Sequence, residues 1–445
     1  MTAITASRAR VIRRRAAPPR RNALPSRPHR PRPRRAGRSA LLCLALALAL
    51  PLLAACSGTS SADDKTFAIA TFFPTSGADA LLGQSLQNAV DLAAKQNANL
   101  GSGYTLTVDH LDAAGSDAAS AAATFAADPA VMGVVGPLDS DAALKMAPIA
   151  AQNGLTTISP SATLPGLTQA DQAQAEGVSF DQLHPKGKPV AFFRLPETDN
   201  ALGKAAADLA TASSQSHGLG AQSVFLVDDG SASAKALASA FAQELKARHG
   251  GVAGQQSVAA GVPDSAQSAV TAIIKADPDI VFYAGDMAAG AELRATLSLT
   301  GAPQLTILTA GPSADHPAWA STVGVTPAAA YTIGILPARD LSTLPGAKDF
   351  IAAYQSAFQG AAPLPQAALA YDAAMDEIAA IRSLVKAGQP VTRAAILAAV
   401  ASAKYSGVTG TIAFDKNGDN AAPIGFSVYT CDTKGTWQYQ TPLNG

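Results

Sequence analysis

Residues 136–163, GPLDSDAALKMAPIAAQNGLTTISPSAT, decide the fold that we predict for this chain. A short apolar run at 131–135 precedes this stretch and stops at its first glycine and proline. Apolar residues at helical spacing predict a helix at 141–152 that ends at Gly154, and a second apolar run at 156–159 predicts another buried strand. This order is typical of a right-handed parallel βαβ unit, in which both loops lie at the carboxyl edge of the sheet.

Three hydroxyl side chains stand at the loops of this unit. Ser140 occupies the expected N-cap of the helix, and Ser161 and Thr163 follow the second strand. A helix N-terminus has free N–H groups and a positive dipole end, which favour an anion. The three residues therefore predict a site for a small anion such as a carboxylate. The alternative is that Ser140 is only a cap and that the other two are only polar loop residues.

A resemblance to a known family rests on an ordered set of segments. These are FAIATFFPTSGADALLGQSLQNAVDLA from Phe67, VVGPLDS from Val134, ISPSATLPGLT from Ile158, FFRL from Phe192, DPDIVFYAG from Asp277 and YSGVTGTIAFDKNGD from Tyr405. The set resembles the solute-binding proteins of the type I periplasmic-binding fold, specifically the leucine/isoleucine/valine-binding family that serves ABC transporters. The ordered set is specific for the fold and the broad role, and much less specific for the ligand.

The resemblance implies an α/β fold of two doubly wound parallel-sheet lobes that are joined by a three-crossing hinge. Alternating strand-like and helix-like segments also favour parallel sheets with helices on both faces. We assign 66–196 and 334–411 to lobe 1, and 197–333 and 412–445 to lobe 2. In this division a strand expected at 331–335 returns to lobe 1. Three crossings allow two lobes to close on a ligand without unfolding.

The N-terminal segment predicts export and a lipid anchor. Residues 1–39 carry thirteen Arg and no acidic residue, and the apolar run at 41–55 is shorter than the roughly 20 residues that a membrane-spanning helix needs. The sequence LAAC that ends at Cys56 resembles a bacterial lipobox, which implies diacylglycerol attachment at Cys56. We therefore expect 1–55 to be a signal peptide with a long basic leader, and 56–65 to be the lipidated cysteine and a tether. The alternative is an ordinary signal with a chance cysteine.

The charge of the expected mature chain excludes a nucleic-acid partner. The full chain has 33 basic and 33 acidic residues, and loss of the leader removes thirteen basic and no acidic ones, which leaves a net charge of −13. Such a surface offers no patch for nucleic acid or anionic lipid. Cys431 would then be the one cysteine besides the acylated Cys56, so no intramolecular disulfide and no cysteine zinc site are expected.

Other motifs are better explained by structural roles. The DKNGD sequence at 415–419 hints at a calcium loop, but Phe426 stands where the bidentate acid is needed, so a hairpin turn is the better account. His110 and Asp112 lack a third metal ligand, and we expect His110 to be structural. We interpret the polar stretch 169–189 as a loop insertion near the cleft. Because GxSxG, HExxH and P-loop patterns are missing, we predict no catalytic residue, no metal and no cofactor.

The resemblance also implies residues that contact the ligand. Ser140 and Thr163 would hold a carboxylate, and Ser161 would contribute mainly through its backbone. Leu82, Ser233 and Asp286 stand at positions where the family has aromatic walls.

The acid that pairs with the ligand's ammonium in the family falls near Ala310, where this chain has no carboxylate. Asp286 is the expected replacement and Asp315 the less favoured one, while the alternative is that Asp286 is a solvated loop acid. A wider and more polar pocket predicts that a polar amino acid, a small amide or another carboxylate-bearing metabolite binds better than leucine, isoleucine or valine.

Together these features predict an extracytoplasmic substrate-binding lipoprotein of an ABC importer. Its partners would be a small-molecule solute, the ABC permease and ATPase subunits, and the outer face of the cytoplasmic membrane through the lipid anchor. A ligand-sensing receptor, or an enzyme on the same fold, is the alternative, because fold does not fix function. Permease and ATPase genes beside this one would distinguish transport from sensing.

Overall fold

The computed structural model describes residues 65–324 and 326–443. The predicted signal peptide at 1–55, Cys56 and most of the tether lie outside these residues. Within the described ranges, no helix combines the length and the apolar character that crossing a membrane requires.

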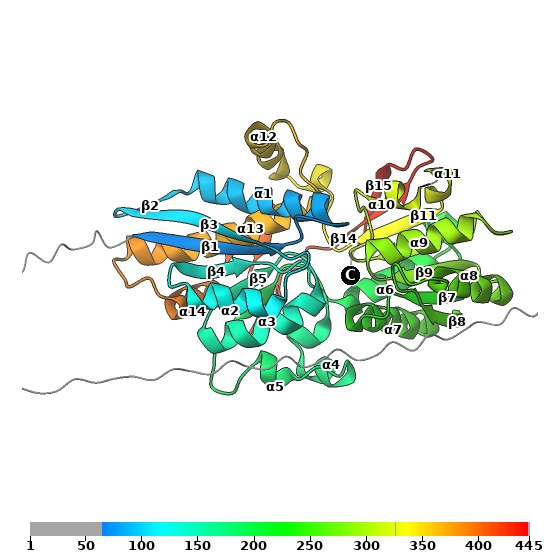
Figure 1. The fold of residues 1–445 in the computed structure, drawn as a ribbon, viewed down its shortest axis with the longest axis horizontal. Helices are drawn as coiled ribbons and strands as arrows, with labels where there is room; N and C mark the ends of the chain where they lie inside the picture. Colours follow the sequence, from blue (N-terminus) through cyan, green and yellow to red (C-terminus); the bar gives the residue numbers. More distant parts are fainter. Residues whose placement is uncertain (1–64, 325, 444–445) are drawn as a thin grey trace, which may run out of the picture. The chain divides into compact units, whose positions relative to one another are not determined.

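A first sheet of six strands has the order β2-β3-β1-β4-β5-β6 (Figure 1). Its strands are β1 (Thr66–Phe73), β2 (Asn99–Gly101), β3 (Tyr104–Asp112), β4 (Val131–Val135), β5 (Thr156–Ser159) and β6 (Phe192–Arg194). All neighbours pair in parallel except the short β2, which is antiparallel to β3. The two apolar runs that flank the predicted helix thus form adjacent parallel strands, as the sequence predicts.

Both faces of the first sheet are covered by helices because successive side chains of its strands point to opposite faces. In β1, Ile69 and Phe73 pack in one apolar cluster, and Ala68, Ala70 and Phe72 pack in another. The first cluster includes α1 (Ala80–Gln96), α12 (Ala347–Ala357), α13 (Pro365–Lys386) and α14 (Arg393–Ser402), and the second includes α2 (Ala118–Ala127) and α3 (Ser140–Asn153). This sheet and these helices are called lobe 1 below.

A second sheet of seven strands has the order β15-β14-β11-β10-β9-β7-β8. Its strands are β7 (Ser223–Asp228), β8 (Gly251–Ser257), β9 (Ile280–Ala284), β10 (Ile307–Ala310), β11 (Thr332–Leu336), β14 (Phe426–Cys431) and β15 (Trp437–Leu443). The prediction that the strand near 331–335 returns to lobe 1 is wrong, because β11 pairs in parallel with β10 and antiparallel with β14. The sequence pattern identified the strand, but only pairing with distant strands decides which sheet it joins.

Helices also cover both faces of the second sheet. Val224 and Leu226 of β7 pack with α6 (Asp199–Thr211) and α7 (Ala232–Ala247), whereas Phe225 and Val227 pack with α8 (Ser265–Ala276) and α9 (Met287–Ser298). Two short helices, α10 (Trp319–Val323) and α11 (Thr326–Ala329), precede β11. This sheet and its helices are called lobe 2.

The chain passes between the lobes three times, as predicted. The passages lie between β6 and α6, between β11 and α12, and between the small β12–β13 pair (Tyr405–Ser406 and Thr411–Ile412) and β14. The buried Arg194 at the end of β6 donates from Nε to Asp419 Oδ1 at 2.6 Å and from an Nη to the Leu164 carbonyl at 2.6 Å. This ion pair connects the first passage to the third.

Several smaller predictions have clear outcomes. The DKNGD motif is a turn in which the Asn417 and Asp419 amides donate to Asp415 Oδ1. His110 has a structural role, as expected, since its ring bonds to the Thr71 hydroxyl at 2.7 Å.

The stretch 169–189 is not simply a loop, because it contains the helices α4 (Ala170–Ala175) and α5 (Phe180–Leu183). Leu183 of this segment is buried against apolar residues next to the first sheet. None of its residues lines the main cavity described below.

Candidate functional site

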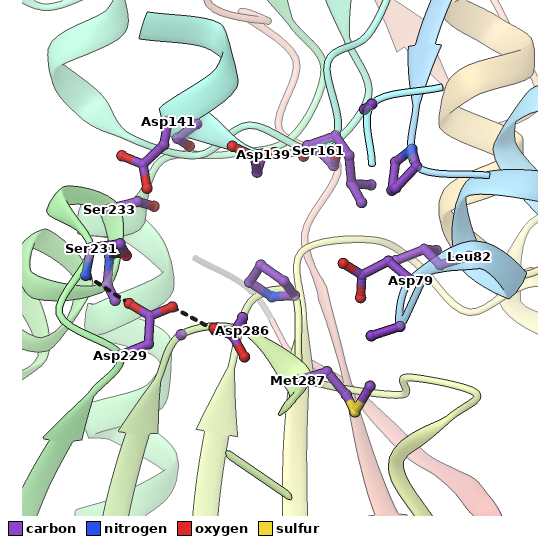
Figure 2. A pocket seen from close by; sticks show the side chains of 18 of the residues that line it. Asp79, Leu82, Asp139, Asp141, Ser161, Asp229, Ser231, Ser233, Asp286 and Met287 are labelled. Carbon is purple, nitrogen blue, oxygen red and sulfur yellow. Dashed lines mark hydrogen bonds between the residues drawn. The ribbon is translucent and has the colours of Figure 1, made fainter. Parts of the chain in front are cut away.

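A cavity of about 450 Å³ lies where loops of both lobes meet. Its lining comes from the loops that follow β1, β3, β4, β5, β7, β9 and β10 and from the beginnings of α1, α3, α6, α7 and α9. Figure 2 shows part of this lining. The carboxyl ends of the strands in an open α/β sheet are the usual place for a ligand. All six residues predicted to contact a ligand are part of this lining: Leu82, Ser140, Ser161, Thr163, Ser233 and Asp286.

Ser140 is not the cap of its helix. The cap of α3 is Asp139, whose Oδ1 accepts the Ala142 amide at 2.7 Å, and Ser140 is the first helical residue. Ser140 Oγ instead accepts the amides of Thr163 and Leu164, both at 3.1 Å. The residue thus ties the two loops of the βαβ unit together. Within the described residues, its hydroxyl proton has no acceptor and is available to donate. The sequence pattern placed the helix correctly. It did not decide whether Asp139 or Ser140, both good N-cap residues, is the N-cap.

Ser161 and Thr163 make bonds within the loop that follows β5. Ser161 Oγ donates to the Leu138 carbonyl at 2.5 Å, and its amide donates to Ser159 Oγ at 3.3 Å. The Thr163 side chain hydrogen-bonds to the carboxyl group of Asp199. An ionised carboxylate only accepts, so this bond uses the Thr163 hydroxyl proton. Both donors of Thr163 therefore have partners within the protein.

Leu82, Ser233 and Asp286 complete the predicted set. Leu82 lies in the first turn of α1 and is buried, and Ser233 lies in the first turn of α7. Asp286 caps α9, with the Ala289 amide donating to its Oδ1 at 2.7 Å. Ala310 and Asp315 do not line the cavity. Among the acids that the sequence suggested, the geometry thus brings Asp286, and not Asp315, to the site.

The cavity lining holds five carboxylates that the sequence analysis did not single out. They are Asp79, Asp139, Asp141, Asp199 and Asp229. Each lies just after a strand or within the start of the next helix, and Asp79 and Asp139 are caps. An acidic residue at several of these loops was visible in the sequence, as in LDSD and VDDG. Acidic caps are so common at helix starts that this pattern alone did not indicate a site.

Five of the six acids surround the empty centre of Figure 2: Asp79, Asp139, Asp141, Asp229 and Asp286. We call these five residues the acidic ring. Two members are linked directly, because the Asp286 amide donates to Asp229 Oδ2 at 2.7 Å. Asp229 also accepts the Ser231 amide at 2.8 Å, while His316 Nε2 lies 3.1 Å from Asp79 Oδ1.

Burial and mutual repulsion raise the pKa of several ring carboxylates. Burial raises the pKa of Asp139, and the charge of Asp79 raises it further. Burial also raises the pKa of Asp141, with added effects of Asp139 and Asp229. For Asp286, burial again dominates the raised pKa, followed among the like charges by Asp229 and Asp79. The ring is therefore electrostatically unfavourable while no positive charge lies inside it.

Asp199 lies outside the ring but lines the same cavity. Its side chain is only 2% exposed, and burial raises its pKa to about 6 against the opposing effects of the Thr163 hydrogen bond and the Arg194 charge. The lining includes no Lys, Arg, His or aromatic residue among the described residues. No group of three or more acidic, His or Cys side chains in the described chain converges closely enough to hold a metal ion.

Comparisons with known proteins agree with this architecture. A family profile described as "Periplasmic binding protein" matches residues 66–436. A leucine binding protein from Thermotoga maritima is 22% identical, with a TM-score of 0.70 over 85% of this chain and 99% of that one. A branched-chain amino acid transporter substrate binding protein from Streptococcus pneumoniae, solved with isoleucine, is 23% identical, with a TM-score of 0.69 over 85% and 99%.

A more distant neighbour holds a different ligand. The solute binding protein of an ABC transporter from R. palustris, solved with benzoate, is 19% identical, with a TM-score of 0.68 over 85% of this chain and 96% of that one. Among curated proteins, no sequence matches this chain. At these identities the structural neighbours establish the shared fold, and the ligand must be argued from the cavity itself.

Proposed function

Because this chain belongs to the periplasmic binding protein family, we propose that it is the solute-binding lipoprotein of an ABC importer. It takes up an amino acid or a similar small solute in the cavity between its lobes and delivers it to permease and ATPase subunits. One observation carries this proposal: a cavity of about 450 Å³, large enough for a small solute, is lined by both lobes across a three-passage hinge.

The cavity supplies a role for each residue that contacts the solute. Ser140 donates its free hydroxyl proton to an acceptor of the solute, with Thr163 and the Ser161 backbone beside it. Leu82 forms an apolar wall in lobe 1, Ser233 adds a hydroxyl from lobe 2, and Asp286 pairs with an ammonium group. The neighbours that were solved with isoleucine and benzoate support solutes of this size.

The same proposal places the protein on the outer face of the cytoplasmic membrane. Cleavage before Cys56 and its acylation would anchor the chain through its N-terminus. Labelled fatty acid should enter the wild-type protein and be lost from Cys56→Ser, which should also leave the membrane fraction. Incorporation that is equal in both proteins would contradict the anchor without affecting the solute site.

Solute binding is tested with a thermal-shift panel of amino acids, their amides and small carboxylates, followed by calorimetry on the best compound. Thr163→Ala should weaken its binding about tenfold to a hundredfold, because it removes the hydroxyl that hydrogen-bonds to Asp199 at the cavity and a hydrogen bond to a charged group contributes roughly 1.5–3 kcal/mol. Thr124→Ala is the matched control, because Thr124 is exposed and its hydroxyl, within the described part of the chain, donates only to the Ser120 carbonyl of its own helix. Unchanged affinity in Thr163→Ala would remove Thr163 from the site.

A further inference from the structure

The charge of the cavity lining departs from what a zwitterionic amino acid requires. A zwitterion needs donors for its carboxylate and one acid for its ammonium. This lining holds six carboxylates and, among the described residues, no basic side chain. Basic groups act on several of these acids from outside the lining: His316 on Asp79, Lys145 on Asp139 and Asp141, and Arg194 on Asp199. Within the cavity, a single ammonium group would leave several carboxylates without a counter-charge.

The helix N-termini at the cavity are already occupied by the protein's own acids. Helix starts of this kind would otherwise attract an anionic ligand. Asp139 and Asp286 each accept an amide in the first turn of the helix that they cap, and Asp229 accepts the Ser231 amide at the start of α7. The protein itself therefore supplies the negative charges that the N-termini of these helices attract. Little attraction remains for a carboxylate of the solute.

Two carboxylates at the cavity are only partly satisfied by the protein itself. Asp199 is 2% exposed, and its Oδ2 makes no hydrogen bond in the described part of the chain. A buried acceptor without a partner is costly, because its desolvation is not compensated. Asp141 lies in the first turn of α3, near Asp139 and Asp229 and also within the influence of Lys145. Within the described residues, its carboxylate makes no hydrogen bond. Capping therefore does not explain these two residues, and a group that enters the cavity would.

The spacing of the acids excludes a metal ion as their counter-ion. Because no three acidic side chains in the described chain converge on a common point, the ring does not form a metal site. Figure 2 shows the members distributed around an open centre, with Asp141 and Asp139 on one side and Asp229 and Asp286 on the other. Charges that are spread around a cavity match a ligand whose positive groups are also spread. The lining has no aromatic wall in the described residues, so it offers no cation–π contact, and its carboxylates are the groups that can neutralise a cation.

We propose that the cavity selects a small organic cation with at least two separated ammonium or guanidinium groups, held between the carboxylates of the two lobes. The Asp229–Asp286 pair together with Asp141 takes one positive group, and Asp79 and Asp139 take the other. This inference rests on the proposed solute-binding function and specifies the class of solute. A basic amino acid and a linear diamine share this chemistry.

Four probes separate the contributions of the charges. L-Lysine and L-norleucine have the same chain length and differ in the terminal ammonium group, while 1,5-diaminopentane is lysine without its carboxylate. L-Leucine represents the branched apolar amino acids. Calorimetry with the purified full-length protein at pH 7.5 and low salt should give at least tenfold tighter binding of lysine or 1,5-diaminopentane than of norleucine or leucine. The tighter of the two dications identifies the source class, a basic amino acid or a polyamine.

Neutral variants of the ring locate the effect. Asp141→Asn should weaken dication binding at least fivefold without a folding defect, because no described hydrogen bond uses the carboxylate. Asp286→Asn should also weaken dication binding at least fivefold. It should keep the cap of α9, since Asn is also a good N-cap. Asp349→Asn is the matched control, as it removes the same charge from an exposed position on α12. It should leave binding unchanged.

The outcomes distinguish this inference from the proposed function. If leucine or norleucine binds as tightly as the dications, the cationic class is wrong while solute binding stands. If calcium chloride alone binds tightly and displaces the dications, the inference of an organic cation is also wrong. If none of the four probes and no compound of the thermal-shift panel binds at millimolar concentration, both proposals fail.

Discussion

The carboxylates of the acidic ring face a cavity, whereas three acids of α13 are packed in the core of lobe 1. Asp372, Asp376 and Glu377 are each at most 2% exposed. Asp372 has a full set of partners: the amides of Val408 and Thr409 at 2.8 and 2.7 Å, and the Thr409 hydroxyl at 2.6 Å. Glu377 makes no hydrogen bond through either carboxyl oxygen within the described chain.

The two regions show different solutions to the cost of burying a carboxyl group. In the core, the acid is either surrounded by donors, as for Asp372, or burial shifts it toward the protonated form, as for Glu377. Burial and then the charge of Asp376 raise the pKa of Glu377 well above its usual value, and burial followed by Asp372 raises the pKa of Asp376 to about 7. In the cavity a third solution exists, because an entering cation supplies the missing charge. Carboxylates whose mutual repulsion destabilises the protein without ligand thereby stabilise its complex with a cation.

The largest expected effect is a loss of stability when Asp372, the core acid with three hydrogen-bond donors, is removed. Asp372→Ala leaves two amides and a hydroxyl without an acceptor, and each buried donor without a partner costs about 1–3 kcal/mol. We expect the free energy of unfolding to fall by about 3–5 kcal/mol, measured by denaturant titration. Asp349→Ala on the exposed face of α12 should stay within about 0.5 kcal/mol of wild type. A loss below 1 kcal/mol in Asp372→Ala would contradict the structural role of these three bonds.

The second effect is a pH dependence of stability that tests whether Glu377 holds its proton in the folded protein. A carboxyl group whose folded-state pKa is raised holds its proton more tightly in the folded protein, so its contribution to stability is lost as pH rises. Between the ordinary pKa of Glu377 near 4.5 and its raised value, wild type should lose about 1.4 kcal/mol per pH unit from this group.

Glu377→Gln removes the titrating group at nearly constant shape. The stability difference between the variant and wild type should therefore change steadily in favour of the variant from pH 5 to pH 7, measured by urea unfolding at each pH. Asp376 titrates in the same range in both proteins, so the difference isolates Glu377. A difference that does not change with pH would show that Glu377 is not held protonated.

The smallest expected effect is a change in the melting temperature of the protein without ligand when one charge of the acidic ring is removed. Asp141→Asn relieves repulsion from Asp139 and Asp229, which together exceed the attraction of Lys145 that is also lost, and it removes no described hydrogen bond. We expect the melting temperature of the unbound protein to rise by about 1–2 °C, as is common when a functional charge is neutralised. The same variant should weaken dication binding. A lower melting temperature would mean that Asp141 stabilises the fold and is not retained for a ligand.

The local order of elements followed from the sequence. The strands at 131–135 and 156–159 have the predicted bounds, because apolar periodicity and glycine or proline stops act over a few residues. The same local signals placed Ser161 and Thr163 in one loop and Ser140 at the start of a neighbouring helix. Since parallel strands bring their carboxyl ends to one edge, the convergence of these three residues was also predictable.

The tertiary structure decided what the sequence pattern left open. Membership of β11 in the second sheet depends on pairing with β10 and β14, which are distant in sequence. The choice of Asp139 over Ser140 as the cap depends on two amides from another loop that bind Ser140 Oγ.

The acidic ring shows the same division between local sequence and tertiary structure. By itself, the sequence determined that an acid stands at the start of helix after helix, because capping is a local preference. Only the folded chain decided that Asp79, Asp139, Asp141, Asp229 and Asp286 surround one cavity. The physical reason is that electrostatic repulsion and burial depend on distances between segments that are far apart along the chain, and those distances exist only once both sheets have formed.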